Sequence, residues 1–171
     1  PPVPESERSV MNSPLLLAFP VGLGATALLD LANWVRARLF AVPAPGYAMV
    51  GRWVAHMPAG TFRHASIAKA TPHPAEALLG WGLHYAIGVA FAAVLLAATG
   101  PGWAAAPTPG PALMTGALTV VMPFFVMQPA FGLGIAASAT PAPWTARRRS
   151  LVNHLIFGAA LYLAALACSA I

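Results

Sequence analysis

The chain has 171 residues, of which 58% are hydrophobic and only 8% are charged, and its formal net charge is +5. A soluble domain carries roughly 25% charged residues, so this composition excludes an ordinary water-soluble domain and indicates an integral membrane protein. The single cysteine, Cys168, excludes a disulfide framework and a cysteine-rich metal site. Nucleic acid is not an expected partner, because the basic residues fall in loops beside apolar stretches.

Four apolar stretches dominate the sequence, and each is about as long as the roughly 20 residues that an α-helix needs to cross a bilayer. They cover residues 15–34, 78–98, 113–137 and 151–171, and Asp30 is the only formally charged residue in them. Lipid cannot satisfy free backbone groups, so these stretches are expected to be helical. The predicted fold class is all-α: a polytopic membrane protein whose residues 13–171 form a single four-helix bundle, preceded by a disordered tail at residues 1–12.

The loop at residues 35–77, between the first two spans, is predicted to be partly helical. Residues 47–57 interleave apolar side chains with Arg52 and His56, a pattern typical of a short amphipathic helix on a membrane surface. The Pro-Ala-Gly sequence at residues 58–60 should end this helix. A second helical piece is expected at residues 61–70, with Thr61 as its N-cap.

The third span contains two prolines and a Gly-x-Gly sequence. Pro123 and Pro129 predict that this helix is the kinked one. The sequence Gly132-Leu133-Gly134 lies inside the predicted span, so its glycines are expected to serve close helix packing.

The basic residues are distributed unequally between the loops. Residues 35–77 and 138–150 contain eight lysines and arginines, whereas residues 99–112 contain no charged residue at all. Because loops rich in lysine and arginine stay in the cytoplasm, both basic loops are predicted to be cytoplasmic. The N-terminus, the C-terminus and the neutral loop are then predicted to lie outside.

The two halves of the chain share a pattern that suggests an internal repeat. Gly22-Leu23-Gly24 precedes Trp34 at the same spacing as Gly132-Leu133-Gly134 precedes Trp144, and a His-x-x-x-Gly sequence occurs at His84 and at His154. Two parallel hairpins related by an axis along the membrane normal would explain this pattern. Chance is the alternative, because short apolar repeats arise easily in sequence rich in alanine, glycine and leucine.

Several short motifs together resemble a known family. They are Gly51-Arg52-Trp53, His56-Met57-Pro58, Gly60-Thr61-Phe62-Arg63-His64, His84-Tyr85, Met127-Gln128-Pro129-Ala130 and Asn153-His154. The set is similar to a bacterial inner-membrane family of small four-span proteins that is known as a domain of unknown function. The resemblance covers nearly all of the chain after Met11. It implies the fold class and an inner-membrane location, and it brings no established activity.

The candidate ligand-binding residues are polar side chains in or beside the spans: Asp30, His84, Gln128, Asn153, His154 and Arg52. The five in the spans fall within roughly 5–13 Å of the predicted cytoplasmic boundary, at 1.5 Å per residue. Burying such groups is costly without partners, so they are expected to face one another in a polar pocket. An intramembrane carboxylate such as Asp30 is a functional candidate. The alternative is that these side chains only join helices by hydrogen bonds.

Metal and haem are further hypotheses. His56 and His64 are the candidate metal ligands, although no His-x-x-x-His spacing supports them and a solvated role is the alternative. Asp30 or Met127 could join them: imidazole with carboxylate suits zinc or iron, and imidazole with thioether suits copper. A haem between His84 and His154 is conceivable, because membrane four-helix bundles hold haem between facing helices.

No catalytic motif is recognisable in the sequence, so enzyme activity stays an open question. The leading function is binding of a small ligand or ion in a pocket that opens to the cytoplasm, with transport as one use of it. The alternative is an accessory or scaffold subunit that docks a partner through residues 35–77, and the third is a haem- or metal-binding redox protein. Besides the lipid bilayer, the expected partner is a second copy of the chain or a membrane complex.

The predicted orientation can be tested with reporter fusions. A fusion at Ala104 should report the outer side of the membrane, because the neutral loop is predicted there, and a fusion at Ala142 should report the cytoplasm. The activity of fused alkaline phosphatase and the fluorescence of a fused fluorescent protein show on which side of the membrane each site lies. The reverse result would overturn the orientation and the cytoplasmic placement of the pocket.

Overall fold

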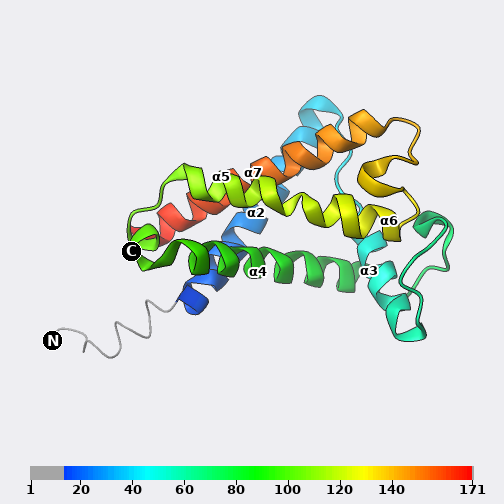
Figure 1. Ribbon diagram of the computed structural model, residues 1–171, viewed down its shortest axis with the longest axis horizontal. Coiled ribbons are helices and arrows are strands. Elements are labelled where there is room, and N and C mark those ends of the chain that lie inside the picture. Colours follow the sequence, from blue (N-terminus) through cyan, green and yellow to red (C-terminus); the bar gives the residue numbers. More distant parts are fainter. Residues whose placement is uncertain (1–13, 171) are drawn as a thin grey trace. The chain divides into compact units, whose positions relative to one another are not determined.

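The computed structural model describes residues 14–170, which form helices, turns and irregular segments (Figure 1). This part of the chain contains no strand, and the predicted all-α class is confirmed. The tail predicted at residues 1–12 lies outside the described residues.

Four helices are long and apolar enough to cross a membrane: Leu16–Phe40, Glu76–Ala105, Pro109–Ala130 and Pro143–Ser169. The first lies in α2 (Pro14–Phe40) and the second is α4 (Glu76–Ala105). The third begins with α5 (Pro109–Thr119) and ends with α6 (Gln128–Ala130), and the fourth is α7 (Pro143–Ser169). Large apolar side chains such as Met114 and Leu118 are about two-thirds exposed, which suits a lipid environment.

Two of these helices are irregular where the sequence contains proline. In α4 the helix breaks at Gly100, which has φ 75° and precedes Pro101. The third span widens into a π-helix at Met122–Met127, between α5 and α6. Pro123 and Pro129 have no N–H to donate to a regular helix. The π-helix departs from regular geometry at the predicted place, and a kink of this span stays a prediction.

The third span ends at Ala130, whereas the sequence pattern predicts a helix to Ala137. Gly132 and Gly134 have φ of 81° and 74°, and a short 3₁₀ helix follows at Ile135–Ala137. A Cβ atom at Gly132 would overlap the carbonyl oxygen of Ala65. The prediction that this Gly-x-Gly sequence packs inside a helix is therefore wrong: it forms a turn that only glycine can make here.

The turn at Gly132 and Gly134 shows that one part of the predicted repeat is not repeated in structure. The matching Gly22 and Gly24 are part of the regular helix α2, so the two Gly-x-Gly sequences differ in backbone conformation. The repeat stays a prediction for the rest of the two halves.

The described residues divide into two compact units. Unit 1 contains residues 14–32, 85–117 and 155–170, and unit 2 contains residues 33–84 and 118–154. Unit 1 has an apolar core from α2, α4, α5 and α7 that includes Val21, Leu95, Ala112 and Leu161. Its helices approach closely at Gly22, where a Cβ atom would overlap the backbone of Val89.

In unit 2 the loop between the first two spans is folded. It contains α3 (Tyr47–His56), as predicted, and a 3₁₀ turn at Met57–Ala59. Residues 61–70 are not the predicted second helix, because only Ile67–Lys69 form a 3₁₀ turn. They instead bond to the end of the third span: the N–H groups of His64 and Ile67 donate to the carbonyls of Ala130 and Phe131, at 2.8 and 3.1 Å.

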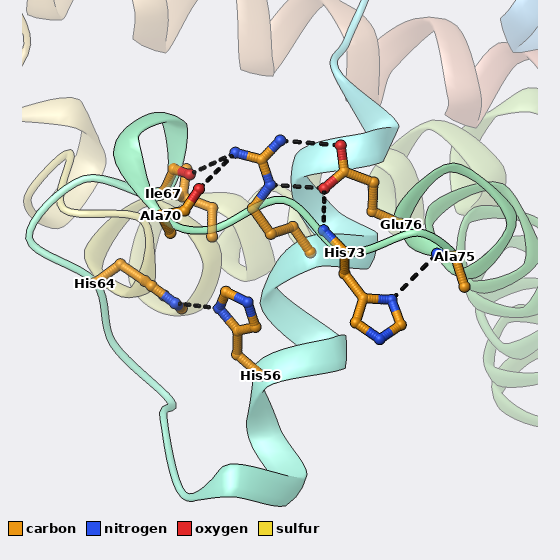
Figure 2. Close-up of polar contacts among 8 residues, drawn as sticks. His56, His64, Ile67, Ala70, His73, Ala75 and Glu76 are labelled. Carbon is orange, nitrogen blue, oxygen red and sulfur yellow. Dashed lines mark hydrogen bonds and ion pairs between the residues drawn. The ribbon is translucent and has the colours of Figure 1, made fainter.

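Arg52 fastens this loop to the start of α4. Its Nε and Nη2 donate to Glu76 at 2.7 and 2.9 Å, and its Nη1 donates to the carbonyls of Ile67 and Ala70. Glu76 also accepts a hydrogen bond from the backbone N–H of His73 (Figure 2). The bond to Glu76 raises the pKa of Arg52 above its ordinary value, and the ion pair closes residues 53–75 into a loop.

Close contact between two glycines lets α3 cross the first turns of α4. A Cβ atom at Gly51 would overlap the carbonyl oxygen of Glu76, and one at Gly80 would overlap that of Tyr47. Neither backbone can give way as a flexible side chain would, so both positions require glycine.

Alanine substitutions at two glycines of α4 test this crossing. Gly80→Ala should destabilise the protein by about 1–3 kcal/mol, the usual cost of overpacking. Gly82→Ala is the matched control, since nothing lies within 4 Å of its added Cβ, and it should be neutral or stabilising by up to about 1 kcal/mol. Thermal unfolding of both variants in one detergent measures the difference, and equal stabilities would contradict the crossing.

Candidate functional site

The start of α7 carries a group of partly buried polar contacts in unit 2. Ser150, Asn153 and His154 are three and four residues apart, so they lie on one side of the helix. Each bonds to a different part of the chain. We name the whole group the α7 polar cluster; its members are Asn33, Arg36, Thr119, Gln128, Ser150, Asn153 and His154.

Arg36, on α2, connects this face with its own helix. Its Nη1 donates to the side-chain oxygen of Asn33 at 3.1 Å and to that of Asn153. The carboxylates in residues 14–170 are those of Asp30 and Glu76. Glu76 is paired with Arg52, and Asp30 accepts from the hydroxyl of Tyr85. Arg36 therefore makes its described bonds with neutral amides, and no ion pair in residues 14–170 balances its charge.

Two further pairs attach α7 to the third span. The side-chain amide of Gln128 donates to the Ser150 hydroxyl at 3.2 Å, and the Thr119 hydroxyl lies 2.8 Å from Nδ1 of His154. Hydrogen bonds of this kind hold membrane helices together for about 0.6–2 kcal/mol each. They keep the polar side chains of α7 in fixed positions.

The cluster has polar atoms left over. Nδ2 of Asn33 and Oε1 of Gln128 are buried without a hydrogen-bond partner, and the two side chains belong to residues that are only 6% and 9% exposed. Buried polar atoms nearly always have a partner, because leaving one unpaired costs about 1–3 kcal/mol. A ligand or an ordered water at these atoms would remove that cost.

Asp30 has a different environment, in unit 1. Its carboxylate accepts a hydrogen bond from the Tyr85 hydroxyl at 3.1 Å, which joins α2 to α4.

His84 belongs to an aromatic group between α3 and α4. Its ring stacks on Tyr47, with the centroids 3.9 Å apart, and lies edge-on to Trp81 at 5.9 Å. Of the six predicted ligand-binding residues, Gln128, Asn153 and His154 thus share the α7 polar cluster. Arg52 is instead paired with Glu76, and a pocket shared by all six stays a prediction.

The two predicted metal ligands lie side by side. Nδ1 of His56 and Nε2 of His64 are 2.9 Å apart, with the rings directed at one another (Figure 2). That distance is a direct hydrogen bond. A zinc ion between them, with bonds of about 2.0–2.1 Å, would have to move the rings apart. Residues 14–170 contain no group of three or more His, Cys, Asp or Glu side chains that could hold a metal.

Four members of the cluster are not among the residues that the sequence pattern singles out: Asn33, Arg36, Thr119 and Ser150. In the sequence Arg36 is one of several basic residues after the first span, which by themselves indicate only membrane topology. Its spacing of three residues from Asn33 places both on one side of a helix, which is the signal that could have identified the pair. Asn153, the second amide that Arg36 bonds to, is 117 residues away from Arg36. No local sequence pattern connects Arg36 with Asn153.

One protein-family model matches the chain. It is described as "Protein of unknown function (DUF2938)" and matches residues 19–168. No curated protein and no solved structure matches the chain significantly.

Two substitutions at Asp30 test whether its charge or its hydrogen bond matters. Asp30→Asn keeps the shape and an acceptor for the Tyr85 hydroxyl, so the melting temperature should stay close to that of the wild type. Asp30→Leu removes the acceptor and should lower stability by about 1 kcal/mol, the typical value of a hydrogen bond. Thermal unfolding in detergent measures both, and equal loss of stability in the two variants would contradict this role.

Proposed function

We propose a function for this chain, which belongs to the DUF2938 family of proteins of unknown function: it binds a small anionic ligand at the α7 polar cluster. The observation that carries the proposal is Arg36, a half-buried cation whose described partners are two neutral amides. A buried charge without a counterion is costly, and an anion is the partner that would stabilise it.

The free hydrogen-bonding groups favour the same chemistry. Arg36 uses Nη1 for both of its described bonds, so Nε and Nη2 remain for a ligand. A guanidinium binds carboxylate or phosphate with two parallel N–H bonds. The unpartnered Nδ2 of Asn33 is a further donor, one helical turn away on α2. Three donors in one place suit a carboxylate or a phosphate group.

The remainder of the cluster supplies an acceptor. Oε1 of Gln128 is buried and unpartnered, so a ligand that carries an N–H or O–H beside its anionic group would use both kinds of site. An amino acid or a hydroxy acid has this combination, and an ordered water is the simpler occupant. The predicted orientation puts the cluster near the cytoplasmic boundary, which would let a soluble anion enter from the cell interior. Transport of that anion is an extension of the proposal.

The two other functions rest on different residues. Docking of a partner is supported by the folded loop at residues 35–77, where Phe62 is 58% exposed and Arg52 restrains the backbone. Metal binding is supported by the His56–His64 pair alone. An absorbance spectrum and metal analysis of the purified protein separate the redox function, because haem gives a Soret band.

Anion binding can be measured as stabilisation of the purified protein in neutral detergent. Acetate, phosphate, glycine and lactate are compared with chloride at equal ionic strength. A ligand at 100 times its dissociation constant should add about 2.7 kcal/mol, and Arg36→Gln should abolish that shift. Arg36→Lys keeps the charge without the planar donor pair and should retain only part of it.

Arg63→Gln is the matched control, because Arg63 is exposed in the loop and its replacement changes the net charge by the same amount as Arg36→Gln. It should respond to the anions as the wild type does. The proposal is wrong if none of these probes stabilises the wild type more than chloride does, or if Arg63→Gln and Arg36→Gln lose the shift equally.

A further inference from the structure

Charge is divided unequally between the two units. Residues 33–84 and 118–154, which form unit 2, contain eight lysines and arginines and one carboxylate, Glu76. Glu76 is paired with Arg52, so seven basic residues have no carboxylate to neutralise them within unit 2. In unit 1 the described residues contain no lysine or arginine, and their single formal charge is that of Asp30.

Two of these arginines stack on exposed tryptophans. The guanidinium of Arg38 lies 5.4 Å from the ring centroid of Trp34, and that of Arg147 lies 4.8 Å from the centroid of Trp144. The tryptophans are 56% and 79% exposed. Tryptophan prefers the boundary between lipid and water, where its apolar ring and its N–H are both satisfied.

We propose that these four residues, which we name the Trp–Arg surface, bind the phosphate headgroups of anionic phospholipids in the bilayer. A guanidinium stacked on an indole still directs N–H groups outward from its edge. Arg147 is held in place as well, since its Nε donates to the carbonyl of Ala136 at 2.8 Å, which leaves both Nη groups for a phosphate.

Neighbouring side chains favour a lipid over a soluble anion. Leu39 and Phe40 directly follow Arg38 at the end of α2 and are about 70% exposed. Apolar side chains next to an arginine fit the boundary between headgroup and acyl chain, where both can be satisfied. A free phosphate or a nucleic acid would leave these two side chains in water.

The two halves of the surface are connected through the protein. Arg36 lies between Trp34 and Arg38 in the sequence and bonds to Asn153 of α7, the helix that carries Trp144 and Arg147. The cyan end of α2 accordingly lies beside the orange first turns of α7 (Figure 1). One lipid layer can therefore contact both tryptophan–arginine pairs. This proposal does not depend on anion binding at Arg36.

The test compares the thermal stability of the full chain in nanodiscs of phosphatidylcholine alone and of phosphatidylcholine with phosphatidylglycerol. The wild type should melt at a higher temperature with phosphatidylglycerol. The double variant Arg38→Gln/Arg147→Gln should lose at least half of that increase, and so should Trp34→Leu/Trp144→Leu, which leaves the net charge unchanged. Arg36→Gln should keep the increase, which separates this proposal from the previous one.

The matched control is Arg63→Gln/Lys69→Gln, which removes two basic residues from exposed loop positions of the same unit. It should keep the increase, and an equal loss would mean that net charge alone is responsible and overturn the proposal. If the glutamine double variant does not fold, Arg38→Lys/Arg147→Lys gives the same comparison at unchanged charge and should lose part of the increase. The proposal is also overturned if phosphatidylglycerol has no effect on the wild type, or if inorganic phosphate in neutral detergent reproduces it.

Discussion

Four helices of this structure are long and apolar enough to cross a membrane, and lipid would offer their polar groups no hydrogen-bond partner, so those groups would have to be satisfied by the protein itself. Thr26 meets this requirement locally, because its hydroxyl donates to the carbonyl of Gly22 one turn earlier. Thr119 and Gln128 meet it across helices, by bonding to His154 and Ser150 of α7. Polar residues in the spans therefore determine which helix faces meet, in addition to apolar packing.

The same constraint explains why the few unsatisfied groups are informative. In water an unpaired amide costs little, since solvent replaces the missing partner. In a buried site beside an apolar helix it costs about 1–3 kcal/mol, and a charge without a counterion costs more. Asn33 and Gln128 carry such atoms, as does His64 outside the cluster, and the half-buried Arg36 carries a charge whose described partners are neutral amides. Two of the three unpartnered atoms thus belong to the same cluster as Arg36, which is the physical basis for proposing a ligand there and not at Arg52.

The sequence predicted those parts of the fold that depend on local chemistry. The apolar stretch at residues 78–98 lies within α4, and the amphipathic pattern at residues 47–57 gives α3 with its 3₁₀ end. The prediction that the third span continues through residues 131–137 is wrong. The composition stays apolar there, although the backbone turns at Gly132. That turn is decided by contact with Ala65, which is distant in sequence. Hydropathy alone cannot distinguish such a turn from the continuation of a span.

The candidate site was harder to predict, because its members are chosen by tertiary contacts. Three of the six residues proposed from the sequence, Gln128, Asn153 and His154, belong to the cluster that the structure assembles. Arg52 met the same chemical criteria, but Glu76 and two carbonyls occupy its donors. An arginine's role depends on whether an acid lies within reach, and here that acid is 24 residues away.

Helix geometry explains why two arginines of α2 that are two residues apart have different environments. Each residue of an α-helix is rotated by about 100° from the one before, so Trp34 and Arg38 lie on nearly the same side and Arg36 on the opposite one. The first side is exposed and carries the stacked Trp–Arg pair, whereas the second contacts Asn153 of α7. One basic helix end can thus serve membrane contact through Arg38 and ligand binding through Arg36, and substitutions at the two positions should be separable for that reason.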